Sequence, residues 1–206
     1  MTASGTPAAS GDPTLHARLD ALCADGRAIF ERFDRDVRER GFHPFVAADY
    51  DVVRPVLLGL HAPGQRFLEW GSATGIITVM ADLIGFDASG IELDSSLVAT
   101  ARAVATRHGS RARFVAGSFL PTGYAYRPPD GDGRTGTIDD GASGYLALGR
   151  PLEDFDVVFG YPWDGEEPVM RDVMRRYGGR DALLLIYDTS GEVHAWRGGR
   201  ERVALG

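Results

Sequence analysis

Hydrophobic positions in the first sixty residues recur at the spacing of a single helix face. One run follows the Asp-Pro pair at 12–13, an N-cap and first-turn signal, and lasts until Gly41; a second starts at Asp49. These runs predict two amphipathic helices. The first is expected to break near Gly26, and the second to kink or restart at Pro55, because proline lacks a backbone donor. The inward positions are Leu15, Leu19, Leu22, Ile29, Phe30, Phe33 and Val37, then Val52, Val53, Val56, Leu57 and Leu60.

From residue 66 onward, short apolar runs alternate with helical ones. This alternation predicts a mostly parallel sheet with helices on both faces, which is a Rossmann-like three-layer αβα sandwich. The predicted strands are 67–69, 89–93, 113–116, 155–159 and 183–187, and the predicted helices are 74–84, a stretch from Asp94 to Gly109, and one that includes Val169, Met170, Val173, Met174 and Tyr177.

Two segments depart from this rhythm. Residues 121–146 are rich in Gly, Pro and Asp and are predicted to form a long flexible loop. Its DGDGRTGTIDDG stretch is not a calcium loop, because Arg134 stands where an oxygen ligand is needed and no glutamate closes the frame. After the turn signal Ser190-Gly191, residues 192–197 alternate in strand fashion, which predicts an antiparallel hairpin onto the strand 183–187.

Composition narrows the class of protein. The chain has 206 residues, 44% of them hydrophobic, and a formal net charge of -7, which suits one α/β domain and makes nucleic acid an unlikely partner. It contains no lysine, so Schiff-base lysine chemistry is excluded. The single Cys23 favours a buried thiol in a reducing, cytoplasmic setting. Residues 1–12 read as a disordered leader, and no apolar run reaches membrane-spanning length, so no membrane partner is expected.

The stretch EWGSATG, residues 69–75, joins a predicted strand directly to a helix. Gly71 and Gly75 frame this turn, and turns of this kind face the ligand crevice of a parallel sheet. No Gly-Lys-Ser/Thr follows, which excludes a P-loop, and the spacing of a dinucleotide fingerprint is not met. Glu69 would also set a carboxylate against a pyrophosphate. The acid instead suits a ligand with an ammonium group, and Glu92, which ends the next strand, suits the two hydroxyls of a ribose.

In this order and spacing, FLEWGSATG, GIELD and FVAGSF resemble the motifs of the class I S-adenosylmethionine-dependent methyltransferase family, over residues 66–187. The resemblance implies strand order 3-2-1-4-5 and S-adenosylmethionine as cofactor. It implies that the cofactor is bound by Glu69, Gly71, Ser72, Ala73, Gly75, Glu92, Leu93, Ser118 and Phe119. Ala73 replaces a usual glycine, and Ser118 an often-found aspartate. For this family the chain ends early, because the tail after strand five is too short for the usual helix and two further strands.

The residues after strand four are the candidates for chemistry. Amino-methylating members of the family carry Asn or Asp, then Pro-Pro and an aromatic, where this chain has Gly160-Tyr161-Pro162-Trp163. The amide that holds a target nitrogen is absent. Tyr161 is therefore the candidate catalytic residue, as a hydroxyl donor, a weak base or a stacking partner, with plain packing an equal alternative. Asp164 and Glu167 are spaced as a capping box, which we favour over a catalytic carboxylate pair.

The remaining candidate residues can also be explained by structural roles alone. His43, Phe45 and Tyr50 are placed either to cross the methionine end of the cofactor or to pack a loop between helices, which is slightly favoured. The five histidines have no partners at ligand spacing, so no metal site is expected.

The chain is thus expected to comprise a leader (1–12), N-terminal helices (13–62) and a cofactor-binding domain (63–206). It is expected to transfer a methyl group from S-adenosylmethionine to a small-molecule or protein acceptor. The alternatives are an inactive cofactor-binding accessory protein and, on thinner support from WDGEE, aminopropyl transfer. Oligomeric state is left open.

Overall fold

The computed structural model describes residues 13–38, 46–125, 141–163 and 165–205. A central sheet of seven strands organises this part of the chain. The strands are β1 (Arg66–Trp70), β2 (Asp87–Glu92), β3 (Arg113–Ala116), β4 (Val157–Gly160), β5 (Leu183–Tyr187), β6 (Val193–Arg197) and β7 (Glu201–Val203). The helices are α1 (Pro13–Arg38), α2 (Tyr50–Leu60), α3 (Ile76–Ile84), α4 (Ser95–Arg107), α5 (Gly144–Leu148) and α6 (Glu167–Tyr177), with a 3-10 turn at Leu152–Asp154.

The strands lie in the order β3-β2-β1-β4-β5-β6-β7, and the first five are parallel. The predicted fold class and the order 3-2-1-4-5 are confirmed. β6 returns antiparallel beside β5, with Leu183 opposite Arg197 and Tyr187 opposite Val193, which confirms the predicted hairpin. β1 has neighbours on both sides, so the loop after it lies at the centre of the sheet's carboxyl edge.

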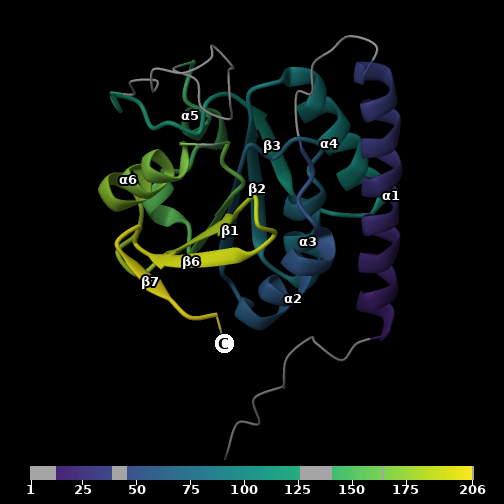
Figure 1. The fold of residues 1–206 in the computed structure, drawn as a ribbon, viewed down its shortest axis with the longest axis horizontal. Coiled ribbons are helices and arrows are strands. Elements are labelled where there is room, and N and C mark those ends of the chain that lie inside the picture. Colours follow the sequence, from purple (N-terminus) through teal and green to yellow (C-terminus); the bar gives the residue numbers. More distant parts are fainter. Residues whose placement is uncertain (1–12, 39–45, 126–140, 164, 206) are drawn as a thin grey trace, which may run out of the picture.

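Helices cover the two faces of the sheet in separate layers (Figure 1). α2, α3 and α4 lie on one face, and the long α1 packs outside them against α3. α5 and α6 lie on the other face. Each layer has its own apolar core: one is built around Phe67, Val79 and Phe159, the other around Leu68, Trp70 and Met170. This alternation of β1 and β4 side chains between two cores is the burial pattern of a parallel sheet covered on both faces.

Neither N-terminal helix is interrupted where the sequence predicts a break or a restart. α1 runs through Gly26 without interruption. A β-carbon at this position would come within 2.9 Å of both Ile76 Cγ1 and Tyr50 Cε2. Gly26 therefore permits close packing and does not end the helix. α2 likewise continues through Pro55, six residues after its N-cap Asp49. One missing backbone donor is offset there by the packing of Val53 and Leu57, which are fully buried.

The C-terminal tail holds more structure than predicted. It forms two further strands, β6 and β7, which follow β5 through tight turns and pair antiparallel. Within the predicted loop 121–146, α5 begins at Gly144, and the segment 126–140, including Arg134, lies outside the described residues. The predicted leader 1–12 lies outside them too. Of the helices in the described part, none has the length and apolar character needed to cross a membrane.

Candidate functional site

The loop after β1 turns sharply at the carboxyl edge of the sheet. Gly71, Ala73 and Gly75 all have left-handed backbone angles, with φ of 68°, 43° and 79°. A side chain at Gly75 would also approach Ala101 Cβ and Phe114 Cζ to 2.7 Å, so glycine there lets α3 pack against its neighbours. Ala73 is the only non-glycine residue with positive φ among the described residues, at a conformation that disfavours a β-carbon.

The side chain of Glu69 lies in the protein interior beneath this loop. Its side chain is buried, and its Oε2 accepts hydrogen bonds from the Thr78 backbone N–H at 2.9 Å and from the Thr78 hydroxyl. Burial raises the pKa of Glu69 to about 8, against the Thr78 bonds, which lower it. The carboxyl group is therefore mostly protonated at neutral pH in the ligand-free protein. It also satisfies a donor in the first turn of α3.

Glu92 lies at the end of β2, beside the same loop. Its two oxygens accept from backbone groups: Oε2 from Ala73 N at 2.8 Å and Oε1 from Asp94 N at 3.0 Å. Burial raises its pKa, although these backbone bonds favour the charged form. The bonds fix the carboxyl group at the mouth of the loop, and each oxygen keeps lone pairs for a further donor.

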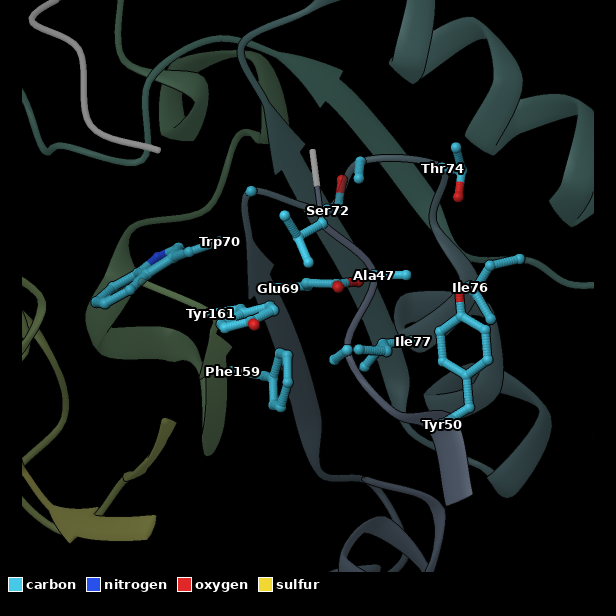
Figure 2. A pocket seen from close by; sticks show the side chains of 14 residues that line it. Ala47, Tyr50, Glu69, Trp70, Ser72, Thr74, Ile76, Ile77, Phe159 and Tyr161 are labelled. Atoms are coloured by element: carbon cyan, nitrogen blue, oxygen red, sulfur yellow. The ribbon is translucent and has the colours of Figure 1, made fainter. Parts of the chain in front are cut away.

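A small cavity of about 40 Å³ opens between this loop and the segment 46–48. Figure 2 shows Glu69 pointing toward Ala47, with Phe159 and Tyr161 on one side and Tyr50 beside Ile76 on the other. Trp70 points away from these side chains. Of the described residues that line the cavity, Glu69 is acidic and none is basic. That volume is room for about three water molecules, and the cavity is partly open to solvent.

The other predicted cofactor residues are spread around the loop. Ser72 and Ala73 line the cavity, and the buried Ser72 Oγ has no hydrogen-bond partner in the part of the chain that the structure describes. Ser118 and Phe119 are buried and lie outside the cavity lining: Ser118 Oγ accepts from Leu120 N, and Phe119 stacks on Trp70 with ring centroids 4.8 Å apart. Leu93 follows β2 and is half-buried. The contact of Leu93, Ser118 and Phe119 with an adenine stays a prediction.

Tyr161 follows β4 and lines the cavity on the side opposite α3. Its ring meets Tyr187 edge to face, with centroids 4.9 Å apart, and burial, Tyr187 and Asp188 raise its pKa. At Gly160 a β-carbon would point at Met170 Sδ, 2.8 Å away. An amide side chain at position 160 would therefore need Met170 to move.

The predicted capping box before α6 is wrong in register. The helix begins at Glu167 with Glu166 as its N-cap, and the Glu166 carboxylate accepts from Trp163 N at 2.9 Å. Pro168 in the first turn moves the start of the helix toward the chain's C-terminal side. Asp164, like His43 and Phe45, lies outside the described residues, whereas Tyr50 is buried and lines the cavity.

Sequence reasoning missed two polar contacts near the site. Thr78 holds Glu69, and nothing in the motif assigns it a role. At the end of β5, Ser190 and its neighbours hold the pKa of Asp188 at about 2, and Asp188 Oδ2 lies 2.7 Å from His194 Nε2. Arg202 donates to His194 Nδ1, so Nε2 carries the proton toward Asp188. The Asp188 contacts close the β5–β6 turn. Within the described residues no three His, Cys, Asp or Glu side chains gather as a metal site.

Comparison with known proteins points to one class. No protein-family model matches the chain. Over 64 residues it is 36% identical to ribosomal protein L11 methyltransferase from Thermus thermophilus, a stretch that covers 30% of this chain and 25% of that enzyme. The match thus spans about a quarter of the length of this curated relative.

Solved structures with a similar backbone include two methyltransferases. One is an RNA methyltransferase from Salinibacter ruber in complex with S-adenosyl-L-homocysteine, at 18% identity over 68% of this chain and 76% of that one, with a TM-score of 0.49. Another is a TehB-like S-adenosylmethionine-dependent methyltransferase from Corynebacterium glutamicum, at 17% identity over 79% and 72%, with a TM-score of 0.43.

The sheet order identifies the fold independently of these scores. Five parallel strands in the order 3-2-1-4-5 with helices on both faces form a Rossmann-like αβα sandwich. This fold is the one that the resemblance to the methyltransferase family implies, and the Thermus match agrees with that resemblance in sequence.

Proposed function

We propose that the chain binds S-adenosylmethionine at the carboxyl ends of β1 and β2 and transfers its methyl group to an acceptor. The observation that carries this proposal is the pair of carboxyl groups at the turn after β1. Glu92 is fixed by Ala73 N and Asp94 N where a ribose would present two hydroxyls. Glu69 lines a cavity whose described residues include no basic group to bind a pyrophosphate.

The charge of Glu69 gives this site a specific chemistry. With a pKa of about 8, Glu69 is mostly neutral until a cation arrives. A ligand ammonium close to a buried carboxyl group lowers its pKa, so cofactor binding at neutral pH is expected to release a proton. Anionic ligands would raise the pKa further and find no compensating positive charge. The site therefore fits the aminoacyl end of S-adenosylmethionine better than it fits a dinucleotide.

The acceptor would approach from the side of β4 and β5, where Tyr161 and Tyr187 meet. The sulfonium supplies a methyl group with a good leaving group, so alignment and exclusion of water contribute much of the rate. Tyr161 would orient the nucleophile through its ring or its hydroxyl. The acceptor would be a small molecule or a group on a protein. An accessory protein that binds the cofactor without turnover is the second candidate, favoured by Ala73 and by the glycine at position 160.

Calorimetry with S-adenosylhomocysteine and with NAD tests the cofactor. We expect S-adenosylhomocysteine to bind and NAD not to bind, and Glu92→Gln to weaken binding about 10- to 100-fold, because a hydrogen bond to a charged group is worth about 1.5–3 kcal/mol. The matched control Glu153→Gln changes an exposed glutamate of the 3-10 turn and should leave binding unchanged. Binding of NAD alone, or equal loss in both variants, would refute the assignment.

Incubation with labelled cofactor and cell extract then separates enzyme from accessory protein by the presence or absence of methylated product.

A further inference from the structure

Thr78 stands in the first turn of α3, and its side chain is completely buried. Its backbone N–H and its hydroxyl both donate to the same Glu69 oxygen, Oε2. Among the described residues, Glu69 Oε1 takes part in no hydrogen bond, and Glu69 lines the cavity below the loop. One oxygen of the carboxyl group is therefore committed to the helix and the other is left for the cavity.

We propose that Thr78 is a positioning residue for cofactor binding: it holds Glu69 so that Oε1 faces the cavity and stabilises the charged form that receives a ligand ammonium. This inference rests on the proposed function, since it requires an aminoacyl ligand at this site. The hydroxyl matters because it is a second donor to a buried carboxyl group that burial otherwise keeps protonated. Without it, Glu69 retains only the backbone donor of Thr78 and ionises at higher pH.

Other titratable groups face Glu69 from each neighbouring element. Tyr50 at the start of α2 and Tyr161 after β4 line the same cavity, and Glu92 from β2 raises the pKa of Glu69 by its charge. Burial raises the pKa of both tyrosines, so they stay neutral around neutral pH. Glu92 is held by two backbone donors in the protein with or without the Thr78 hydroxyl. The difference between variants at position 78 therefore reports on Glu69.

The alternative role for this contact is structural, because Glu69 also satisfies a donor of the first turn of α3. The two roles differ in which ligands they affect. S-adenosylhomocysteine carries the aminoacyl group, whereas 5′-methylthioadenosine has the same adenosine and sulfur without it. A positioning role affects only the first ligand, whereas damage to the loop affects both.

The test measures the affinity of both ligands from pH 6 to 9 for wild type, Thr78→Val and Thr78→Ser. At pH 7.5 we expect Thr78→Val, which keeps the shape and removes the hydroxyl, to bind S-adenosylhomocysteine about tenfold more weakly. The rise of its affinity with pH should have a midpoint about one pH unit higher than that of wild type. Titration of the ligand amine is the same for each protein and cancels in this comparison. Thr78→Ser should restore wild-type behaviour, and 5′-methylthioadenosine should bind all three proteins equally.

Three outcomes overturn the inference, and a fourth overturns the proposed function on which it rests. Equal loss of both ligands in Thr78→Val, or no change in either, contradicts a positioning role while the proposed function stands. A lower affinity without a displaced pH profile contradicts the electrostatic part of the argument. If wild type binds neither ligand, the proposed function itself fails.

Discussion

The buried carboxyl group of Glu69 makes stability depend on pH in a way that a single substitution removes. Its pKa is about 8 in the folded protein, against an ordinary value of 4.5, which the unfolded chain should approach. Below pH 4.5 the group is protonated in both states and costs nothing. Between 4.5 and 8 the unfolded chain releases the proton and the folded protein keeps it, so stability falls as pH rises and then levels off above 8. At about 1.4 kcal/mol for each pH unit, the total loss over these 3.5 units is on the order of 5 kcal/mol.

Glu69→Gln keeps an oxygen that can accept both bonds from Thr78 and cannot ionise. Relative to wild type, the variant should become more stable as pH rises from 5 to 8.5, by on the order of 4 kcal/mol across that range, in the absence of ligand. Urea unfolding followed by tryptophan fluorescence at several pH values measures the difference. Any imperfect fit of the amide adds a constant, so only the dependence on pH tests the reasoning, and Glu153→Gln provides a flat reference. A difference between variant and wild type that stays constant over this range would show that Glu69 is ionised in the folded protein.

Three further changes test the turn and the acceptor wall. Ala73→Gly should stabilise the protein by up to about 1 kcal/mol in urea unfolding, because the left-handed backbone costs alanine more than the added flexibility of glycine does; a loss of stability would contradict this. Gly75→Ala should destabilise it by about 2–4 kcal/mol, since the new methyl group would lie 2.7 Å from Ala101 Cβ and Phe114 Cζ, and an unchanged unfolding midpoint would contradict the packing argument. Tyr161→Phe should leave S-adenosylhomocysteine affinity unchanged in calorimetry and lower methyl transfer about tenfold or more if the hydroxyl steers the acceptor; unchanged transfer would leave only a role for the ring.

The fold followed from hydrophobic periodicity because the strands of a parallel sheet are buried on both faces and stand out as short apolar runs. Residues 113–116 and 183–187 were predicted with their observed limits. The errors occur where tertiary packing overrides a local signal. Gly26 and Pro55 look like helix breakers, yet Gly26 is required for contact with Tyr50, and α2 tolerates the lost donor at Pro55. The strand β7 was missed because three residues between glycines and the chain end show no period.

The residues of the site could be predicted from the sequence, whereas the protonation state of Glu69, which decides its ligand preference, could not. The sequence shows that Glu69 is acidic and precedes a glycine turn, which predicts that its charge repels a pyrophosphate. The structure changes that argument, since burial keeps Glu69 mostly protonated at neutral pH. Discrimination then depends on which ligand can ionise the group. A cationic ligand group stabilises the ionised carboxylate of Glu69 and so offsets the cost of burying its charge. An anionic group gains no such stabilisation, because Glu69 stays neutral and no described lining residue is basic.

Because ligand recognition depends on the ionisation of Glu69, the residues that hold its carboxyl group matter, and Thr78 could not be found among them from the sequence. Its contribution comes from two donors aimed at one oxygen nine residues away along the chain, an arrangement that arises only when β1 and the first turn of α3 are brought together by the turn at 71–75. The same turn sets Ala73 N against Glu92, so one loop conformation aims both carboxyl groups. A change that alters the turn should therefore affect the recognition of ribose and of the ammonium group together, whereas a change at Thr78 should affect the ammonium alone. Comparison of Gly75→Ala with Thr78→Val, each against S-adenosylhomocysteine and 5′-methylthioadenosine, separates the geometry of the loop from the charge of Glu69.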